Sequence, residues 1–433
     1  MQIKINLHKN VPKMLSKSVK HNLIVVNSDK SNFLTESVTA KIKRLKLKLS
    51  DLEDKFLSLD DEYQAHTVIL KSSDKSVFKV QTQLRKSLKN LLDENPTEIN
   101  LIIETDNILW NRELLYTALL NSKDLPSRKK KVDKKSLKVI NFYGKLELTD
   151  VKEIEALVEG NTLSRILTMT PPNDLTPTIY RKEIKKLASK SKWTFNEYTM
   201  PQLKKMGAGA FVAVGQGSEP QDAAIVHLTY TPKAYKKQVT LVGKGICFDT
   251  GGHNLKPSKY MYSMHEDMNG SATALGILHA ATVSKLPIKI DCWLAIAQNH
   301  IGPKAYKQND VVKALNGKTI EIIHTDAEGR MVLADTLTLA TKKKSDAVID
   351  FATLTGCMAV AMGDRYSGIF SNVPELACLA VGAGQKAGER VCSFPFDEDY
   401  EEDIESDIAD IKQCTLEGGP DHIHAARFLS QFL

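Results

Sequence analysis

The amino-acid sequence predicts an α/β protein of two domains, a smaller N-terminal domain and a larger C-terminal one. The chain has 433 residues, which is too many for one ordinary hydrophobic core. Short apolar runs alternate with segments of helical spacing, a pattern typical of α/β domains. A long helical segment that ends at two adjacent prolines separates the two domains.

The N-terminal domain, predicted at residues 1–147, alternates strands with helices, which favours a mainly parallel sheet. A basic loop at 127–135 precedes its last strand and contains the run Arg128-Lys129-Lys130-Lys131. Apolar runs predict strands at 23–26, 68–70, 100–103 and 137–143, and helical spacing predicts helices at 77–92 and 108–120.

A linker helix is predicted at 148–169, where Thr149 and Asp150 can cap its start. It must end before Pro171 and Pro172, because prolines cannot continue a helix. The larger domain follows at 170–433, and Asn316-Gly317 is its strongest hairpin signal. We expect its strands at 239–243, 288–297 and 347–352, its helices at 272–284 and 331–343, and hairpin strands at 311–315 and 319–324.

The composition is that of a globular protein, with 42% hydrophobic and 26% charged residues. The net charge of +7 is weak evidence for a polyanionic partner, and a solvated loop is the simpler interpretation of the basic run. Six scattered cysteines without a CxxC pair indicate reduced thiols. No apolar stretch resembles a signal peptide or a membrane span. We therefore expect a cytoplasmic protein without membrane or nucleic-acid partners.

Ionisable side chains gather where one apolar strand runs into a glycine-rich turn. Lys244 and Asp249 flank the end of this strand, and Lys256 and Asp267 follow. Charged groups beside buried strand ends are costly unless they are paired or bind a metal. Open α/β sheets place their sites at such strand ends. On its own, this segment would also suit a phosphate-binding loop.

A second charged segment, Thr325-Asp326-Ala327-Glu328-Gly329-Arg330, follows another apolar strand. In extended backbone, residues two apart project to the same side, so we expect Asp326, Glu328 and Arg330 to face one cavity. The carboxylates of both segments would repel one another strongly, and two divalent cations would offset that charge. Ligation by carboxylates without cysteine fits Zn²⁺ or Mn²⁺, with Co²⁺ and Mg²⁺ as further candidates.

Residues 243–267 and 325–333 resemble the two signature blocks of the leucine aminopeptidase (cytosol aminopeptidase) family. The hexapeptide Thr-Asp-Ala-Glu-Gly-Arg is highly specific, and residues 170–177, 207–218 and 352–356 also resemble the family pattern. The resemblance covers about residues 160–433. It implies a catalytic C-terminal domain with a central mixed sheet flanked by helices.

The resemblance also implies a dinuclear metal site in each subunit. Asp249 and Glu328 would bridge the two ions, and Lys244 and Asp267 would complete the tighter site. Asp326 would complete the more exchangeable site. A lysine ligand must be neutral, and the charge of the metals would depress its pKa.

Catalytic and substrate-binding roles follow from the same resemblance. Lys256 would stabilise the oxyanion, and Arg330 would hold a bicarbonate that acts as general base toward a metal-activated water. Met264, Thr353 and Gly356 would line a modest apolar pocket suited to Leu or Met. The substrates would be peptides with a free N-terminus, and the family assembles as homohexamers.

Three features depart from the family pattern. His324 stands where Asn is usual, and Asn269 stands where Gly is usual, although Asn tolerates positive φ. Residues 425–433 resemble a helix that precedes the family's final segment. We therefore expect a catalytic domain that lacks this segment, with weaker substrate binding, folding or assembly but with every metal ligand present.

Each residue also has a plainer interpretation when it is taken singly. Asp267 could cap a helix, Lys256 could be a surface lysine, and Asp326 and Glu328 could be cap and first-turn residues. Together at the family spacing, the charged residues favour the metal centre. The nearby histidines are interpreted as polar lining and not as ligands: His253, His265 and His300.

Three other functions compete with an active aminopeptidase. One is a metal-binding relative without activity, and another is a dinuclear phosphoesterase. The third is a DNA-binding regulator, for which the basic loop is the only support.

Overall fold

The computed structural model describes residues 3–15, 17–60, 63–71, 76–132 and 134–433. The chain forms two compact units, which we call the N-terminal unit (residues 1–158 and 379–391) and the C-terminal unit (residues 159–378 and 392–433). The boundary near residue 158 falls inside one continuous helix, α4 (Leu148–Met169). The sequence does not suggest that residues 379–391 belong with the N-terminal unit.

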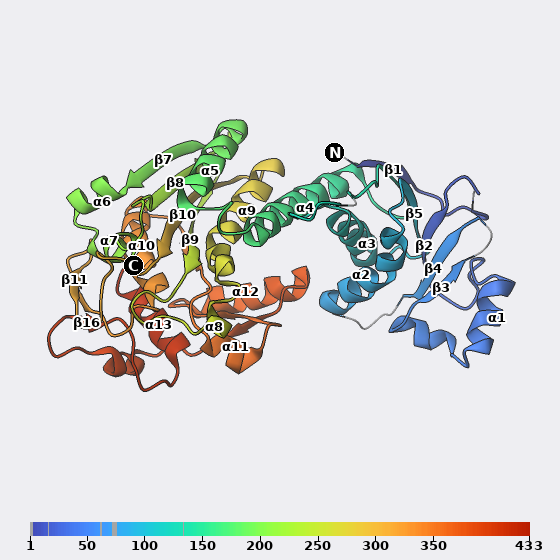
Figure 1. The fold of residues 1–433 in the computed structure, drawn as a ribbon. Coiled ribbons are helices and arrows are strands. Elements are labelled where there is room, and N and C mark those ends of the chain that lie inside the picture. The colour runs from blue at the N-terminus through green and yellow to red at the C-terminus, as the bar shows by residue number, and fades with distance from the viewer. Residues whose placement is uncertain (1–2, 16, 61–62, 72–75, 133) are drawn as a thin grey trace. The chain divides into compact units, whose positions relative to one another are not determined.

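A mainly parallel sheet forms the centre of the N-terminal unit, as predicted (Figure 1). Its order is β1-β6-β5-β2-β4-β3, and only β3 runs antiparallel to its neighbour. The strands are β1 (Lys4–His8), β2 (His21–Val26), β3 (Leu57–Asp60), β4 (Ala65–Leu70), β5 (Glu98–Ile103) and β6 (Val139–Tyr143).

Both faces of this sheet are covered, because successive side chains of a buried strand point to opposite faces. Leu23 and Leu101 pack on one face against α2 (Val77–Asp93), α3 (Ile108–Asn121) and the start of α4. Ile24 packs on the other face, where α1 (Glu36–Arg44) and a short 3₁₀ helix, η1 (Leu49–Glu53), complete the core.

A row of asparagines crosses four parallel strands of this sheet. Asn6 donates to Asn141 (2.8 Å), Asn141 donates to Asn100 (3.0 Å), and Asn100 donates to Asn22 (2.7 Å). The four residues are direct partners in the strand register. Because Asn22 and Asn100 are buried, a shift in register would leave their amides without partners. The row therefore specifies the strand alignment.

A mixed sheet forms the centre of the C-terminal unit, in the order β13-β9-β10-β8-β7. Strands β13, β9 and β10 are parallel, and β8 is antiparallel to both of its neighbours, β10 and β7. This arrangement confirms the predicted fold class. The strands are β7 (Thr194–Thr199), β8 (Ala224–Tyr230), β9 (Lys237–Asp249), β10 (Ile288–Asn299) and β13 (Ala347–Phe351).

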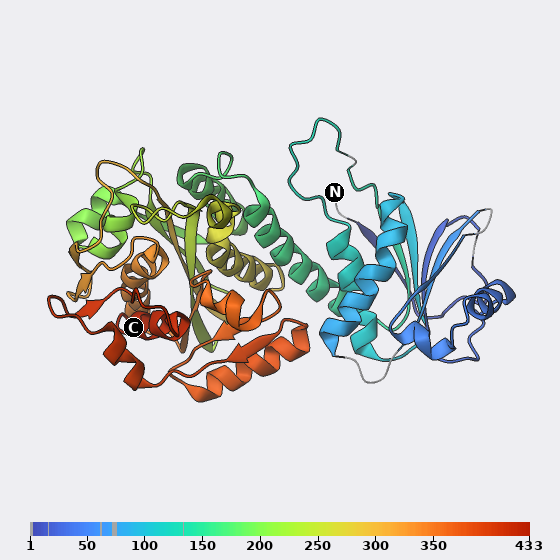
Figure 2. The ribbon, with the colours of Figure 1, turned by 60° about the horizontal axis from the view of Figure 1, so that its bottom comes forward.

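Helices flank both faces of this sheet (Figure 2). Helices α5 (Pro177–Ser191) and α9 (Asn269–Val283) pack on one face, and α7 (Gly209–Gly215), α10 (Glu328–Ala340) and α13 (Asp421–Ser430) pack on the other. The remaining elements are α6 (Met200–Met206), α8 (Ser258–Met261), η2 (Met264–Met268), β11 (Val311–Lys313), β12 (Thr319–Glu321), η3 (Thr341–Lys343), α11 (Cys357–Met362), β14 (Ser367–Ile369), α12 (Pro374–Ala387), β15 (Val391–Ser393), η4 (Glu398–Ile404) and β16 (Ile411–Lys412).

The predicted hairpin is confirmed. Strands β11 and β12 are antiparallel, and Gly317 has φ 97°, which glycine adopts without strain. Two helix starts were wrong: α9 begins at Asn269 and not at 272, and α10 begins at Glu328 and not at 331. The second difference matters, because it places part of the second charged segment inside a helix.

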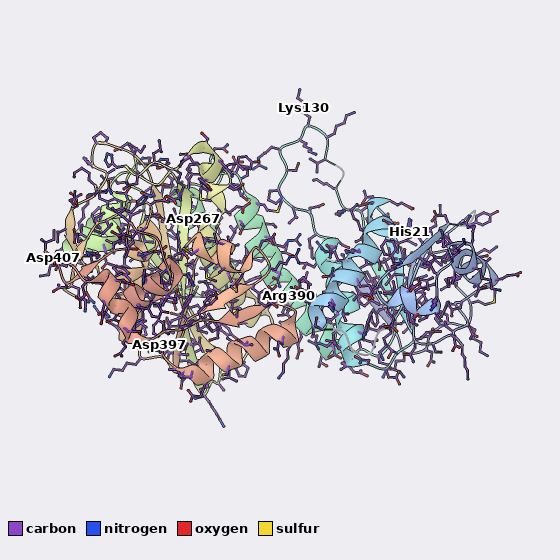
Figure 3. All side chains as sticks on the ribbon, turned by 90° about the horizontal axis from the view of Figure 1, so that it is seen from below. His21, Lys130, Asp267, Arg390, Asp397 and Asp407 are labelled. Carbon is purple, nitrogen blue, oxygen red and sulfur yellow. The ribbon has the colours of Figure 1, made fainter. Side chains whose placement is uncertain are left out.

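The structure bears on three expectations from the composition, which concern membrane spans, cysteine pairing and the basic loop. Within the described residues, none of the helices combines the length and apolar character needed to cross a membrane. All six cysteines are unpaired. The described residues of the basic loop are exposed, and Lys130 lies on a stretch of it that projects from the rest of its unit (Figure 3).

Candidate metal centre

The charged residues of the C-terminal unit meet at one edge of its sheet. Asp249 ends β9, Asn299 ends β10, and Thr353 follows the end of β13. Because these strands are parallel and adjacent, their carboxyl ends lie side by side. Asp267 reaches the same edge from η2, and Glu328 reaches it as the first residue of α10.

The extended-backbone interpretation of residues 326–330 was wrong. Glu328 and Arg330 lie in the first turn of α10, so their side chains leave the helix in different directions. Glu328 contacts Lys244, whereas Arg330 contacts Gln413 and Asp421. The prediction that both acidic residues of the segment, Asp326 and Glu328, face one site holds for a different reason, because the turn before α10 brings them together.

Lys244 is buried among acidic residues. Its Nζ lies 2.9 Å from Asp267 Oδ2 and 2.9 Å from Glu328 Oε1, and it donates to the carbonyl oxygen of Thr353 at 2.9 Å. A Cβ atom on Gly329 would lie 2.6 Å from Lys244 Cε, so a side chain at this position would have to displace Lys244 from its place among the carboxylates. The glycine of the hexapeptide therefore has a packing role.

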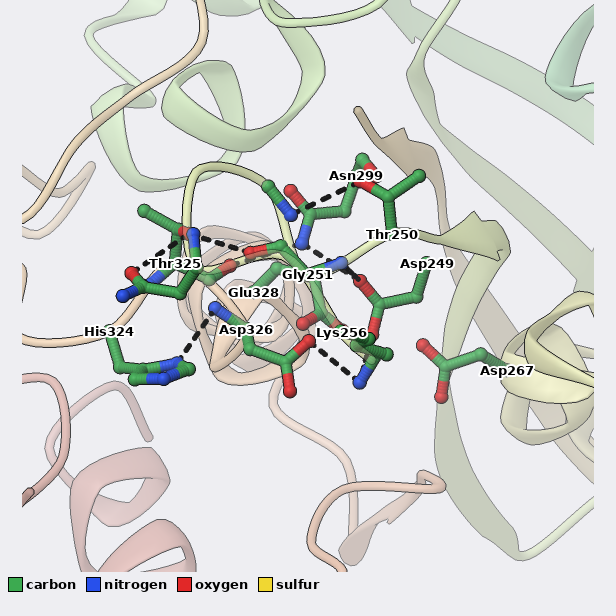
Figure 4. A network of polar contacts seen from close by, with 12 residues as sticks. Asp249, Thr250, Gly251, Lys256, Asp267, Asn299, His324, Thr325, Asp326 and Glu328 are labelled. Atoms are coloured by element: carbon green, nitrogen blue, oxygen red, sulfur yellow. Dashed lines mark hydrogen bonds and ion pairs between the residues drawn. The ribbon is translucent and has the colours of Figure 1, made fainter. Parts of the chain in front are cut away.

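Lys256 joins the two remaining carboxylates. Its Nζ lies 2.9 Å from Asp249 Oδ2 and 2.6 Å from Asp326 Oδ1 (Figure 4). The side chain is only 14% exposed, so the interpretation as a surface lysine was wrong.

Three carboxylates of this cluster are close enough to share a metal ion. One oxygen from each of Asp249, Asp326 and Glu328 lies within 4.8 Å of the others. Among the described residues, no donor satisfies the buried Oε2 of Glu328. A buried carboxylate oxygen without a donor is costly, and a divalent cation would satisfy it. The donor set therefore fits hard or borderline divalent metals.

Burial and mutual repulsion dominate the electrostatics of the carboxylates. Burial first, and then the neighbouring Asp249, raise the pKa of Glu328 to about 7 and that of Asp326 to about 6. Burial also raises the pKa of Asp267. Two lysines balance only half of the four carboxylate charges, so the cluster attracts further positive charge.

The same carboxylates act on the lysines in the opposite sense. Burial lowers the pKa of Lys244, but Asp267, Glu328 and Asp249 outweigh it and raise the pKa overall. For Lys256, burial is likewise outweighed by Asp249 and Asp326, and the pKa is raised.

A buried amide that the sequence analysis missed orients one of the acidic residues. Asn299 Nδ2 donates to Asp249 Oδ1 (2.8 Å) and to the carbonyl oxygen of Thr325 (3.0 Å), and the backbone N–H of Gly251 also donates to Asp249 Oδ1 (2.9 Å) (Figure 4). The sequence offered one signal for Asn299: it is a polar residue at the end of a long apolar strand. A second buried amide, Gln413, donates to the carbonyl oxygen of Ala327 (3.0 Å) and has no comparable signal in the sequence.

Arg330 is buried and already has partners. Nη1 donates to the carbonyl oxygen of Gln413 (2.8 Å), and Nη2 pairs with Asp421 Oδ1 (2.9 Å). Within the described residues, its Nε has no hydrogen-bond partner.

Residues 162–433 match the family described as cytosol aminopeptidase family, catalytic domain. A probable cytosol aminopeptidase of Prochlorococcus marinus (strain MIT 9312) is 36% identical over 384 residues, which are 86% of this chain and 78% of that relative. The chain belongs to the cytosol aminopeptidase family.

Other members support this membership over different lengths. A probable cytosol aminopeptidase of Roseiflexus castenholzii (strain DSM 13941 / HLO8) is 40% identical over 279 residues, which cover 64% of this chain and 57% of that relative. The chain thus spans less than two thirds of that relative. The solved structure of the bottromycin maturation enzyme BotP in complex with Mn has a TM-score of 0.86 at 27% identity, covering 96% of this chain and 90% of that one.

Two departures from the cytosol aminopeptidase pattern have structural explanations. His324 Nδ1 accepts a hydrogen bond from the backbone N–H of Asp326 (3.2 Å), a bond that an asparagine oxygen could also accept. Burial, and then Lys256, lower the pKa of His324 and favour the neutral ring that this bond requires. The reasoning for Asn269 was wrong: its φ is −58°, so the position needs no left-handed residue.

Two of the three residues predicted to line the side-chain pocket, Met264 and Thr353, lie next to Asp267. Met264 begins the same short helix, η2. The Thr353 hydroxyl donates to Asp267 Oδ1 (2.7 Å), and Gly356 precedes α11. Thr353 therefore contacts the metal cluster through both its hydroxyl and its carbonyl oxygen.

Proposed function

We propose that this chain is a metal-dependent aminopeptidase that releases N-terminal amino acids from peptides. The observation that carries the proposal is the buried cluster of four carboxylates and two lysines at the strand ends of the family's catalytic domain. Leu and Met are the preferred N-terminal residues. Broad specificity follows, because one methylene changes binding by only roughly 1–3 kcal/mol.

Five residues would hold two divalent cations. Asp249 and Glu328 would serve both ions, Lys244 and Asp267 would serve one, and Asp326 the other. When bound, the ions would activate a water nucleophile and polarise the scissile carbonyl. Lys244 would have to be neutral as a ligand, which the charge of the ions favours. Zn²⁺ and Mn²⁺ are the expected metals, and BotP was solved with Mn.

Lys256 would stabilise the negative charge that develops on the substrate carbonyl oxygen. It is held at the cluster by Asp249 and Asp326, and both carboxylates favour its charged form. With cations bound to these carboxylates, the ammonium group would be released toward the substrate. A cation placed in advance at that point lowers the barrier without reorganisation.

Arg330 would bind a bicarbonate that acts as general base. The family resemblance supports this role, while the pairing of Arg330 with Asp421 competes with it. Bicarbonate would therefore have to displace Asp421 or use the free Nε. The rate should rise on adding bicarbonate to bicarbonate-free enzyme, and this rise should be absent in Arg330→Ala.

The experiment that tests the proposed function measures release of p-nitroaniline from leucine p-nitroanilide with Mn²⁺ or Zn²⁺. We expect metal-dependent release, and no release from the N-acetylated substrate, which lacks the free amine. Absence of release from the free-amine substrate with either metal would reject the proposal. Release from the blocked substrate at a similar rate would replace it with an endopeptidase or amidase.

The assembly and the location are further proposals. We propose a homohexamer, which exposed apolar side chains on the C-terminal unit support: Val360 is 89% exposed and Ile349 is 43% exposed. Light scattering on the metal-loaded protein tests this state, and a monomeric mass would contradict it. We also propose a cytoplasmic location, which the six unpaired cysteines support.

A further inference from the structure

A cavity lies at the strand ends of the N-terminal unit, and none of the residues of the metal cluster is among those that line it. Its volume is about 290 Å³. The loops that follow four parallel strands line it. Its charged lining residues are Lys9, Lys13, Glu104, Asp106 and Lys145, and its apolar ones include Val11, Pro12, Phe33 and Ile103.

The strand order makes this position a topological switch point. From β2 the chain continues to β3 and β4 on one side, whereas from β5 it continues to β6 on the other side. Strands β2 and β5 are adjacent and parallel, so their outgoing connections diverge and leave a crevice. Open α/β sheets bind small ligands in such crevices, outside the carboxyl ends of the strands. Residues after β2 and after β5 both line the cavity.

The charges that line the cavity favour an anion with attached hydroxyl groups. Lys9 pairs at 3.3 Å with Glu147, but both side chains are more than two-thirds exposed, so this pair is weak. In the described part of the chain, neither Lys13 nor Lys145 has an ion-pair partner. Two uncommitted ammonium groups beside one cavity suit a phosphate group.

A buried amide ties together two of the loops that line the cavity. Asn111 is fully buried, and its Nδ2 donates to the carbonyl oxygens of Thr105 (2.8 Å) and Asn107 (2.9 Å). Its Oδ1 accepts from the backbone N–H of Lys145 (2.8 Å). One side chain thus ties the loop after β5, which carries Asp106, to the loop after β6, which carries Lys145.

A glycine lets these two loops approach. A Cβ atom on Gly144 would lie 2.4 Å from Asn111 Oδ1 and 2.5 Å from Ile103 Cγ2. No side chain fits there, so the backbone before Lys145 lies directly against β5. Close backbone packing of this kind is typical of ligand loops at strand ends.

We propose that this cavity binds a phosphorylated sugar, either as a free sugar phosphate or within a mononucleotide. Lys13 and Lys145 would contact the phosphate, and Glu104 and Asp106 would accept hydrogen bonds from sugar hydroxyls. Phe33 and Pro12 would contact the apolar face of the sugar or a base. The volume suits a ligand of this size and is small for a dinucleotide.

Isothermal titration calorimetry on the metal-loaded full chain tests the proposal with three probes: ribose 5-phosphate, AMP and inorganic phosphate. We expect saturable binding of at least one phosphorylated sugar, at least about tenfold tighter than inorganic phosphate. AMP binding more tightly than ribose 5-phosphate would identify the mononucleotide as the source. Equal affinities would identify the sugar phosphate alone.

Charge-reversal variants of the lining lysines test whether the ligand binds in this cavity. Lys13→Glu with Lys145→Glu should weaken binding at least about tenfold, because two charge-assisted contacts are lost. Lys152→Glu, an exposed change on α4, is the matched control and should leave binding unchanged. Binding should also survive Asp249→Asn, which separates this cavity from the metal centre.

Two results would overturn the proposal. One is the absence of saturable binding of both phosphorylated sugars up to about 10 mM. The other is binding that the double lysine variant leaves intact or that Asp249→Asn removes.

Discussion

The two α/β units both place polar residues at the carboxyl ends of parallel strands, but they arrange opposite charges there. In the C-terminal unit, four carboxylates and two lysines are packed together, and Asp249 and Glu328 are almost fully buried. In the N-terminal unit, a neutral amide, Asn111, is buried and holds two of the loops that line the cavity, and Lys9, Lys13 and Lys145 are among the lining residues. The buried groups are charged carboxylates in one unit and a neutral amide in the other. The first site would therefore attract a cation, and the second an anion.

The comparison shows how burial determines the strength of a site. Buried carboxylates repel one another and raise their own pKa values, so they bind a compensating cation strongly. Exposed lysines are already solvated and gain less from an anion. We therefore expect tight metal binding in one unit and modest anion binding in the other.

The largest expected effect comes from removing a carboxylate of the metal cluster. Asp267→Asn should lower metal affinity by more than about 100-fold, because loss of an outer partner alone costs 10–100-fold. Glu266→Gln, an exposed neighbour in the same short helix, should bind metal normally. Titration with Mn²⁺ followed by metal analysis measures both, and equal metal content in the two variants would contradict the ligand assignment.

Removing the Lys256 side chain should lower the rate of the reaction and leave metal binding unchanged. Lys256→Ala should lower kcat by about 10²–10³-fold, as expected for loss of an oxyanion-stabilising group. Metal content should stay unchanged, and Lys259→Ala, which changes an exposed lysine in the adjoining helix α8, should keep full activity. If Lys256→Ala changed only KM, the oxyanion role would be wrong.

Metal affinity should rise with pH between about 5 and 8. The pKa values of Asp326 and Glu328 are raised to about 6 and about 7, so protons compete with metal for these oxygens at acidic pH. Each displaced proton changes the affinity by up to about tenfold per pH unit. Calorimetry of Mn²⁺ binding at several pH values checks the sign, and an affinity independent of pH would contradict it.

Asn299 acts on the metal centre through Asp249. Asn299→Ala removes one hydrogen bond to a carboxylate oxygen and should weaken metal binding by about 10–100-fold. Added metal should restore most of the activity, which distinguishes a positioning residue from a ligand. Activity that saturating Mn²⁺ cannot restore would mean that Asn299 has a direct catalytic role.

The smallest effect should be confined to the N-terminal unit. Asn100→Ala breaks the asparagine row: the buried Asn22 Oδ1 loses its donor, and Asn141 Nδ2 keeps only Glu98 as an acceptor. The free energy of unfolding should fall by about 1–3 kcal/mol. Urea unfolding followed by circular dichroism measures this change, with the exposed Asn90→Ala as control. Equal stability of the two variants would show that the row contributes nothing.

The sequence predicted the elements of the fold well where apolar periodicity was strong. The helices at 77–92 and 108–120 and the strands at 100–103 and 288–297 all appear, within a few residues of their predicted limits. The start of α10 was missed, because Gly329 inside a first turn reads as a loop residue. It is glycine because Lys244 passes against it, a tertiary contact that local propensity does not report.

The candidate metal centre was predictable from two dense motifs, whereas its supporting residues were not. Asn299 and Gln413 are single amides far from either motif in the sequence, and only the fold brings them to the site. The cavity of the N-terminal unit was missed for a similar reason. Its lysines come from separate loops, and only the strand order places those loops together.

We expect the carboxylate cluster to bind two metal ions that the reaction requires. The most direct test titrates metal-stripped protein with Mn²⁺ while metal content and leucine p-nitroanilide hydrolysis are measured together. We predict that activity rises to a plateau at about two ions per chain and that Glu328→Gln shows neither the second ion nor the activity. Full activity of the metal-stripped protein, or wild-type metal content and activity in Glu328→Gln, would contradict the claim.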